Sequence, residues 1–177
     1  MTRGNSRRSD GEKPILFVDV DGVLSLFGFD PSDDLLGHFH WIDGVAHCIP
    51  PASGPLLVEL ATRFELVWAT GWEEKANEYL PHILGLPFRE LPSLTFDGRA
   101  TFGSSHWKLD AITEYAERRP AAWIDDHMEE ACQLWARSRR APTLLIETKP
   151  WVGLDREHAD ELLAWADQLA SSKPAKR

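Results

Sequence analysis

The stretch "ILFVDVDGVL", residues 15–24, is the starting point for the fold of this chain. Four apolar residues lead directly to Asp19 and Asp21, and the chain then reaches Gly22. A short apolar run that ends at a glycine is typical of a buried strand followed by a turn. Residues two apart share one face of a strand, so both carboxylates can flank a single reacting group. The sequence therefore predicts a buried strand with a chemical site at its end.

Beyond this stretch, short apolar runs alternate with amphipathic ones, and turn residues separate them. The pattern predicts strands at 15–20, 65–70, 88–94, 121–126 and 142–147, and helices at 55–64, 73–84, 106–118, 128–138 and 155–170. Strands that alternate with helices indicate right-handed crossovers and a parallel sheet covered on both faces. We therefore predict an α/β fold, a Rossmann-like three-layer sandwich around a central, mainly parallel five-stranded sheet.

Length and composition bound the organisation of the chain. With 177 residues and 43% apolar content, one core is expected, and we predict a single domain over 14–170 with flexible tails at 1–13 and 171–177. Cys48 and Cys132 form no CxxC pair, which argues against a disulfide framework or a thiolate zinc site. No apolar stretch approaches the ~20 residues of a membrane span, so a cytoplasmic protein is expected.

The charge of the chain limits how it could meet nucleic acid. A formal net charge of −9 argues against a broad basic surface that wraps a duplex, although a local basic channel stays possible. The run "ARSRRA" at 136–141 could contact a nucleic-acid backbone, or it could be a solvated helix end whose cations suit the helix C-terminus. The sequence favours the second interpretation.

Acidic residues at the predicted strand ends suggest phosphoryl chemistry. In open parallel sheets, ligands bind at the carboxyl ends of the strands, where "DVDG" and "WIDDH" lie. Asp19 could attack phosphorus, and Asp21 could protonate the leaving oxygen and later take a proton from water. Asp125 and Asp126 could join Asp19 in holding Mg²⁺, which prefers oxygen ligands. Lys108 and the metal would then screen the repulsion between phosphate and nucleophile.

The strand predicted at 65–70 ends in neutral donors. Thr70 and the backbone N–H of Gly71 could bind phosphate oxygens. Trp72 follows them, and it could either touch the substrate or pack under the helix that it begins. The sequence leaves both interpretations open.

These residues together resemble a known family. The set "DVDGV", Thr70, Lys108 and "DD" at 125–126 is similar, in order and position, to the four motifs of the haloacid dehalogenase (HAD) superfamily, over about residues 14–170. More narrowly, "VWATGWEEKAN", "KLDAI", "WIDDH" and "GLDREHADELLAWA" look like the small HAD domains of bacterial Swiss army knife RNA repair proteins. In those proteins the domain is fused to repair partners, and repair proteins are therefore candidate partners here.

The resemblance implies a role for each motif position. Asp19 would be the nucleophile that forms an aspartyl-phosphate, and Asp21 the general acid and base, whose backbone carbonyl also binds magnesium. Lys108 would orient Asp19 and the phosphoryl group, and Asp125 would be a metal ligand; whether Asp126 also contacts the metal stays open. Thr70 would bind the phosphate. An acid at position 21 favours phosphatase over dehalogenase chemistry.

The resemblance also bears on the substrate. The segment 22–52 is too short for the helical cap of many HAD enzymes, so only a short flap and an open site are expected, as seen with bulky substrates. Phe39, His40 and Trp41 in this flap could stack on a base. The interpretation favoured by composition is a β-hairpin whose aromatic residues pack on the sheet.

The sequence thus predicts a magnesium-dependent phosphomonoester hydrolase that acts on a nucleotide or a nucleic-acid end. A phosphatase for a small metabolite or a phosphoprotein is the alternative enzyme, and a non-catalytic phosphate-binding module in a repair complex is the alternative class.

Other interpretations of single features are weaker. The Asp19–Asp21 pair could be a calcium loop or a solvated strand end, but the remaining ligands of such a loop are missing. The histidines of the flap could hold zinc with Cys48, although no second well-spaced pair follows. Four tryptophans are expected in the core: Trp107, Trp123, Trp135 and Trp165.

Overall fold

The computed structural model describes residues 13–30, 32, 34–96, 98, 100 and 104–172. Its strands are β1 (Ile15–Val18), β2 (His38–Ile42), β3 (Val45–Ile49), β4 (Glu65–Trp68), β5 (Ala121–Asp125) and β6 (Thr143–Glu147). Its helices are α1 (Ser53–Ala61), α2 (Ala76–Ile83), α3 (Leu109–Ala116), α4 (Glu130–Ser138) and α5 (Arg156–Ser171), with the short 3₁₀ helices η1 (Glu73–Lys75) and η2 (His106–Lys108). The tails predicted at 1–13 and 171–177 lie almost wholly outside the described residues.

The central sheet is parallel and runs in the order β4-β1-β5-β6. The prediction of a mainly parallel sheet is confirmed. Within the described part of the chain, however, this sheet has four strands and not the five predicted. The segment 88–94 meets β4 only at an isolated bridge between Ser93 and Trp68. Pro92, which has no N–H to donate, precedes that bridge, so the segment cannot extend a regular ladder along β4.

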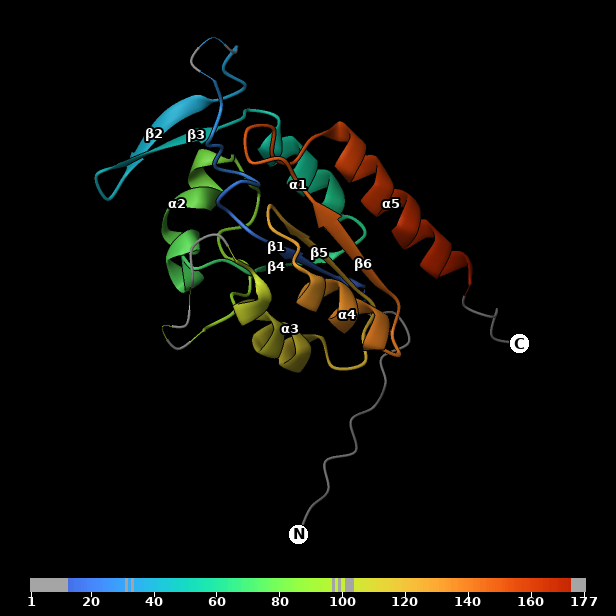
Figure 1. Ribbon diagram of the computed structural model, residues 1–177. Coiled ribbons are helices and arrows are strands. Elements are labelled where there is room, and N and C mark those ends of the chain that lie inside the picture. Colours follow the sequence, from blue (N-terminus) through green and yellow to red (C-terminus); the bar gives the residue numbers. More distant parts are fainter. Residues whose placement is uncertain are drawn as a thin grey trace.

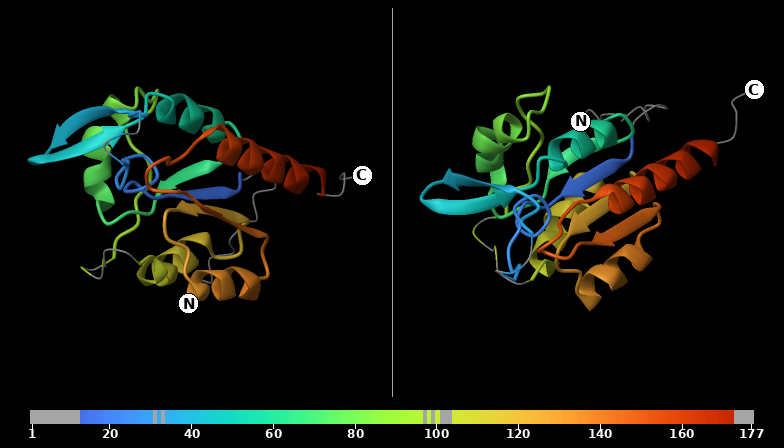
Figure 2. Two further views of the ribbon diagram at one scale, coloured as in Figure 1. Left: turned by 45° about the horizontal axis from the view of Figure 1, so that its top comes forward. Right: turned by 90° about the horizontal axis from the view of Figure 1, so that it is seen from above.

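Two apolar layers cover the sheet, as the three-layer prediction requires. In β1, Leu16 and Val18 face one layer with α1, α2 and α5, and Ile15 and Phe17 face the other with α3 and α4. Figures 1 and 2 show α1 and α5 on one face of the sheet and α3 and α4 on the opposite face. Among the described residues, no helix is both long and apolar enough to span a bilayer.

The segment between β1 and α1 contains the predicted flap, which folds as the antiparallel hairpin β2–β3. Its two-residue turn, Asp43–Gly44, has positive φ at both positions (49° and 81°), the conformation that suits the twist of a tight hairpin. The hairpin projects beyond the end of the central sheet (Figures 1 and 2).

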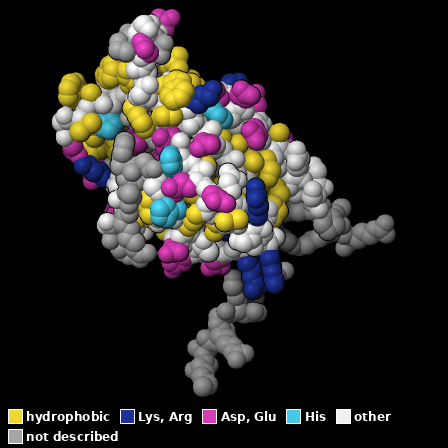
Figure 3. Space-filling view, in the orientation of Figure 1, with side chains coloured by type: hydrophobic (Ala, Val, Ile, Leu, Met, Phe, Trp, Pro, Cys, Tyr) yellow, Lys and Arg dark blue, Asp and Glu magenta, His cyan; other side chains and the backbone are white. Residues whose placement is uncertain are grey.

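The packing expected for the hairpin aromatics is wrong. Phe39 and Trp41 are 51% and 75% exposed, and they do not pack on the central sheet. The cross-strand register pairs them with Cys48 and Ala46 and so puts all four residues on one side of the hairpin. The opposite side carries His47. Figure 3 shows apolar side chains gathered at the end of the molecule that bears the hairpin.

Candidate active site

The carboxyl ends of β1, β4 and β5 meet at one edge of the sheet. Asp19 follows β1 directly, and its backbone N–H donates to the carbonyl oxygen of Ile124 in β5 at 3.1 Å. Asp125 is the last residue of β5. A cleft of about 700 Å³ opens at this edge. Its lining combines acidic and aromatic side chains, namely Asp19, Asp21, Asp125, Asp126, Phe27, Trp72 and Trp107.

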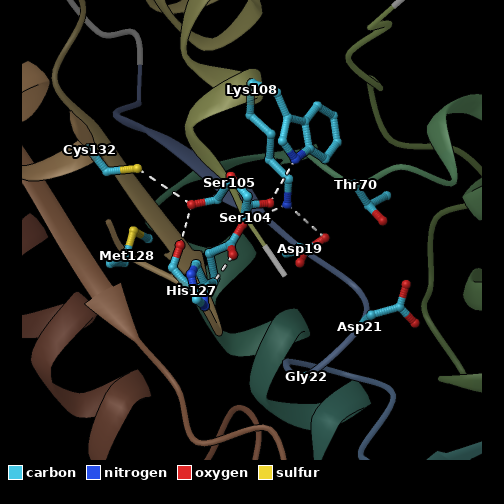
Figure 4. Close-up of polar contacts among 12 residues, drawn as sticks. Asp19, Asp21, Gly22, Thr70, Ser104, Ser105, Lys108, His127, Met128 and Cys132 are labelled. Carbon is cyan, nitrogen blue, oxygen red and sulfur yellow. Dashed lines mark hydrogen bonds and ion pairs between the residues drawn. The ribbon is translucent and has the colours of Figure 1, made fainter. Parts of the chain in front are cut away.

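Lys108 joins two of the predicted site residues. Its Nζ lies 3.1 Å from Asp19 Oδ1 and 2.6 Å from Asp125 Oδ2, and all three side chains are nearly fully buried. Figure 4 shows the lysine reaching down to Asp19 from its helix. Burial alone would lower the pKa of Lys108, but the two carboxylates raise it more. The ammonium therefore stays charged between them.

The turn before Lys108 is held by a buried serine. Ser105 Oγ donates to the backbone carbonyl of His127, beyond the end of β5, and lies 3.4 Å from Cys132 Sγ. Ser105 and Lys108 are also joined along the chain, because the Lys108 N–H donates to the Ser105 carbonyl at 2.9 Å. These bonds (Figure 4) attach the start of η2 to the β5 end, and so bring the ammonium to the carboxylates.

Asp19, Asp125 and Asp126 form an acidic group whose nearest ligand atoms lie within 4.8 Å of one another. Burial and repulsion by Asp19 raise the pKa of Asp125, and they raise the pKa of Asp126 to about 6. One ammonium cannot balance this charge, and buried, converging carboxylate oxygens are the donor set of a hard divalent cation. The group could therefore hold a hard divalent metal ion.

Gly22 permits this convergence. Its φ is +75°, and a Cβ there would lie 2.5 Å from the Cβ of Asp126. A larger residue would push the turn after β1 away from Asp126. The glycine of the opening stretch thus serves the acidic group directly.

Asp21 stands apart from the acidic group. Its Oδ2 accepts a hydrogen bond from the indole Nε1 of Trp72 at 3.0 Å. Burial raises the pKa of Asp21, although the indole donor favours its ionised form and partly opposes that shift. In Figure 4 the Asp21 carboxyl lies across from Lys108, on the side of Thr70.

The two predicted phosphate-binding residues, Thr70 and Gly71, differ in their access to the cleft. Gly71 lines the cleft, and a Cβ on it would come within 3.9 Å of the Trp107 ring. Thr70 is fully buried beside it, and its Oγ1 accepts the N–H of Trp72 at 3.3 Å. The structure therefore brings Gly71, rather than the Thr70 side chain, to the cleft wall.

Several residues of the cleft were not predicted. Trp107 packs partly buried against the second apolar layer, as expected, and it also lines the cleft, with its Nε1 donating to Ser104 O at 2.7 Å. Phe27 and Pro150 form another part of the wall and are joined by a 3.0 Å backbone hydrogen bond. Both lie in loops where no periodicity marks them. His127 also lines the cleft, and its place directly after Asp126 was the signal available in the sequence.

The other predicted tryptophans keep to the core: Trp123 is fully buried, and Trp135 and Trp165 pack partly buried against the two apolar layers. The alternative zinc set does not assemble. His47 instead shares a 2.8 Å hydrogen bond between its Nδ1 and Ser25 Oγ. In the described part of the chain, the metal-ligating side chains that converge are the three aspartates.

This arrangement agrees with a comparison to known families. The family described as the HAD domain in Swiss Army Knife RNA repair proteins matches residues 15–159. The chain belongs to this family. The match confirms the resemblance seen in the sequence motifs and places the chain in a superfamily of hydrolases that includes phosphatases. No curated protein matches the chain.

Proposed function

We propose that this HAD domain is a magnesium-dependent phosphomonoester hydrolase that works through an aspartyl-phosphate. The observation that carries the proposal is the Lys108 ammonium, which lies 3.1 Å from Asp19 and 2.6 Å from Asp125. A buried cation in this position orients the Asp19 carboxylate and offsets its repulsion from the negative charge of an incoming phosphate.

In the first step, an oxygen of Asp19 attacks phosphorus, and the bond from phosphorus to the leaving oxygen breaks. The leaving oxygen takes its proton from the Asp21 carboxyl, whose pKa burial raises above that of an ordinary aspartate. Lys108 offsets the negative charge that the nucleophile and the phosphoryl group bring together. The products of this step are a free hydroxyl compound and a phosphorylated Asp19.

In the second step, a water molecule attacks the same phosphorus, and Asp21 takes the proton of that water. The bond between Asp19 and phosphorus breaks, and inorganic phosphate leaves with both aspartates restored. Asp19, Asp125 and Asp126 would hold magnesium, which when bound supplies a positive charge beside the phosphate oxygens.

For the substrate we propose the terminal phosphate of a nucleotide or nucleic-acid end. Three aromatic side chains, Phe27, Trp72 and Trp107, line the cleft around the carboxylates. Bases stack on such rings whatever their sequence, which contributes ~1–3 kcal/mol per base. The family's occurrence in RNA repair proteins supports the same class and makes repair proteins plausible partners. The exposed Phe39 and Trp41 of the hairpin do not line this cleft.

The test is release of inorganic phosphate, with and without magnesium, from a panel of phosphomonoesters. The panel holds an aryl phosphate, 5′- and 3′-mononucleotides, oligonucleotides phosphorylated at either end, a sugar phosphate and a phosphopeptide. Asp19→Asn should abolish release. Asp167→Asn, which removes a carboxylate from an exposed ion pair with Arg63 on the opposite part of the molecule, is the matched control and should stay active.

The panel also separates the alternatives. Preference for the sugar phosphate or the phosphopeptide would replace the nucleotide assignment and keep the chemistry. A third outcome would favour the non-catalytic binding module. In that case the folded protein releases phosphate from no member of the panel, and wild type and Asp19→Asn bind phosphorylated nucleic-acid ends equally well.

A further inference from the structure

Trp72 links the carboxyl of Asp21 to the β2–β3 hairpin. On one side its indole Nε1 donates to Asp21 Oδ2 at 3.0 Å. On the other side its ring meets the His47 ring edge-on, with centroids 4.8 Å apart. His47 is itself held by the 2.8 Å hydrogen bond between Nδ1 and Ser25 Oγ, in the loop that follows Asp21. The indole is therefore fixed between the strand-end loop and the hairpin.

The turn that follows Trp72 includes a costly backbone conformation. Glu73 has a φ of 51°, in the left-handed region that a residue with a side chain rarely adopts. Its carboxylate accepts the N–H of Phe96 at 2.8 Å, and the N–H of Trp72 donates to Thr70 Oγ1 at 3.3 Å. Side-chain bonds thus hold the turn in place.

Trp72 also stands between two clefts. It lines the catalytic cleft, and it lines a second cleft of about 340 Å³ next to the hairpin, together with His47, Val45 and Lys75. Trp72 and Gly71 are shared by the linings of both clefts, and the polar edge of the indole contacts Asp21. In the second cleft, hairpin residues therefore lie beside Trp72, the residue that contacts Asp21.

We infer that Trp72 is the positioning residue of Asp21, with His47 of the hairpin as its support. The inference rests on the proposed function, in which Asp21 protonates the leaving oxygen. The oxygen that accepts the indole N–H acts as the carbonyl oxygen of the carboxyl group, so the proton resides on the other oxygen, Oδ1. Trp72 thereby stops the carboxyl from rotating and selects the oxygen that delivers the proton.

This role has a consequence that a merely structural tryptophan would not have. An alkyl or ribose oxygen is a poor leaving group and needs the proton in the first step, whereas a nitrophenolate leaves without one. The ratio kcat/KM reports the steps up to the first irreversible one, so it isolates the proton delivery. Loss of the indole donor should therefore lower kcat/KM selectively for substrates with poor leaving groups.

The test compares Trp72→Phe with Trp135→Phe in the full chain with magnesium. Trp135 is a matched control, because its Nε1 also donates to an oxygen, Thr113 Oγ1 at 2.7 Å, on the face covered by α3 and α4. For Trp72→Phe we expect kcat/KM for a sugar phosphate, which has an alkyl leaving oxygen and no base that could stack on the indole, to fall by about 10- to 100-fold, and for p-nitrophenyl phosphate by less than about threefold. Trp135→Phe should change both by the same small factor.

An equal loss for both substrates in Trp72→Phe would overturn the inference and leave the proposed function intact. Wild-type protein that hydrolyses neither substrate would overturn the proposed function, and the inference with it. If Trp72→Phe does not fold, His47→Ala, which removes the ring contact and keeps the indole donor, provides the test. It should show the same selectivity for poor leaving groups at a smaller size, and a uniform loss would again overturn the inference.

Discussion

The two aspartates at the end of β1 are two residues apart, yet they have opposite surroundings. On the Lys108 side, Asp19 is buried and paired with an ammonium at 3.1 Å, within an acidic group that fits a metal. On the Trp72 side, Asp21 accepts a hydrogen bond from a neutral indole, and burial lowers the pKa of the neighbouring His47 below its usual value. The Lys108 side is built around charge, and the Trp72 side around neutral groups.

This difference matches the two tasks of a phosphomonoesterase. A nucleophile must be held in place while a negatively charged phosphate approaches it, and a nearby fixed cation serves both needs. A general acid must carry a proton for part of the cycle, which a cation at close range would oppose but a neutral donor permits. The end of β1 thus supplies two chemically identical aspartates, and contacts with Lys108 and Trp72, both far away in the sequence, give them different electrostatic surroundings.

The largest effect on activity should come from removing the charge on the Lys108 side. Lys108→Met leaves buried carboxylates without their cation, and should lower the free energy of unfolding by about 3 kcal/mol in metal-free buffer and abolish activity. Magnesium should restore part of the stability, because it supplies the missing positive charge. Urea unfolding measures this, with Lys13→Met as the control for an exposed lysine whose Nζ donates to Ala61 O. Equal stability of Lys108→Met and wild type would show that the Lys108 ammonium is not needed to balance the buried carboxylates.

A smaller effect should appear in how magnesium binding depends on pH. Asp126, whose pKa is raised to about 6 chiefly by burial, is protonated in metal-free protein below that pH. The metal must displace this proton, so its affinity should rise as pH increases through 6 and then level off. The thermal shift that magnesium causes should therefore be larger at about pH 8 than at about pH 5. An equal thermal shift at the two pH values would indicate that magnesium does not bind at Asp126.

The smallest effect is expected on the outer side of the hairpin. Trp41 is 75% exposed and lies on the side opposite His47, so Trp41→Ser should change stability by less than about 0.5 kcal/mol and leave kcat/KM unchanged. Trp123→Ala, at a fully buried position, should cost about 3–5 kcal/mol in the same denaturation experiment. A loss of activity in Trp41→Ser would show that the outer side also contacts the substrate.

Much of the fold could be predicted because its signals are local. The apolar runs of β1, β4 and β5 each end at a polar residue, and this was sufficient to align Asp19 and Asp125 at one sheet edge. The strand expected at 88–94 failed for a local reason as well, since Pro92 cannot donate to a ladder. Lys108 was recognised from its position in the motif order, and its helix start does lie beside both carboxylates.

The Trp72 side could not be predicted in the same way. The hydrogen bond between Trp72 and Asp21 joins residues 51 positions apart, and no periodicity records it. Trp107 was expected in the core and does pack against the second apolar layer, but no local pattern showed that its indole, anchored to Ser104, also lines the cleft. Phe27 and Pro150 reach the cleft from loops, whose paths depend on tertiary packing.

The most direct test of the central claim is to look for phosphate on Asp19 when Asp21 is disabled. Asp21→Asn should still react with p-nitrophenyl phosphate in magnesium, because the leaving group needs no proton, but it should be unable to activate water. Mass spectrometry of the acid-quenched protein should then find one phosphoryl group on the Asp19 peptide, and none in Asp19→Asn. Steady release of nitrophenol from Asp21→Asn with an unmodified Asp19, at a rate matched by Asp19→Asn, would contradict the account.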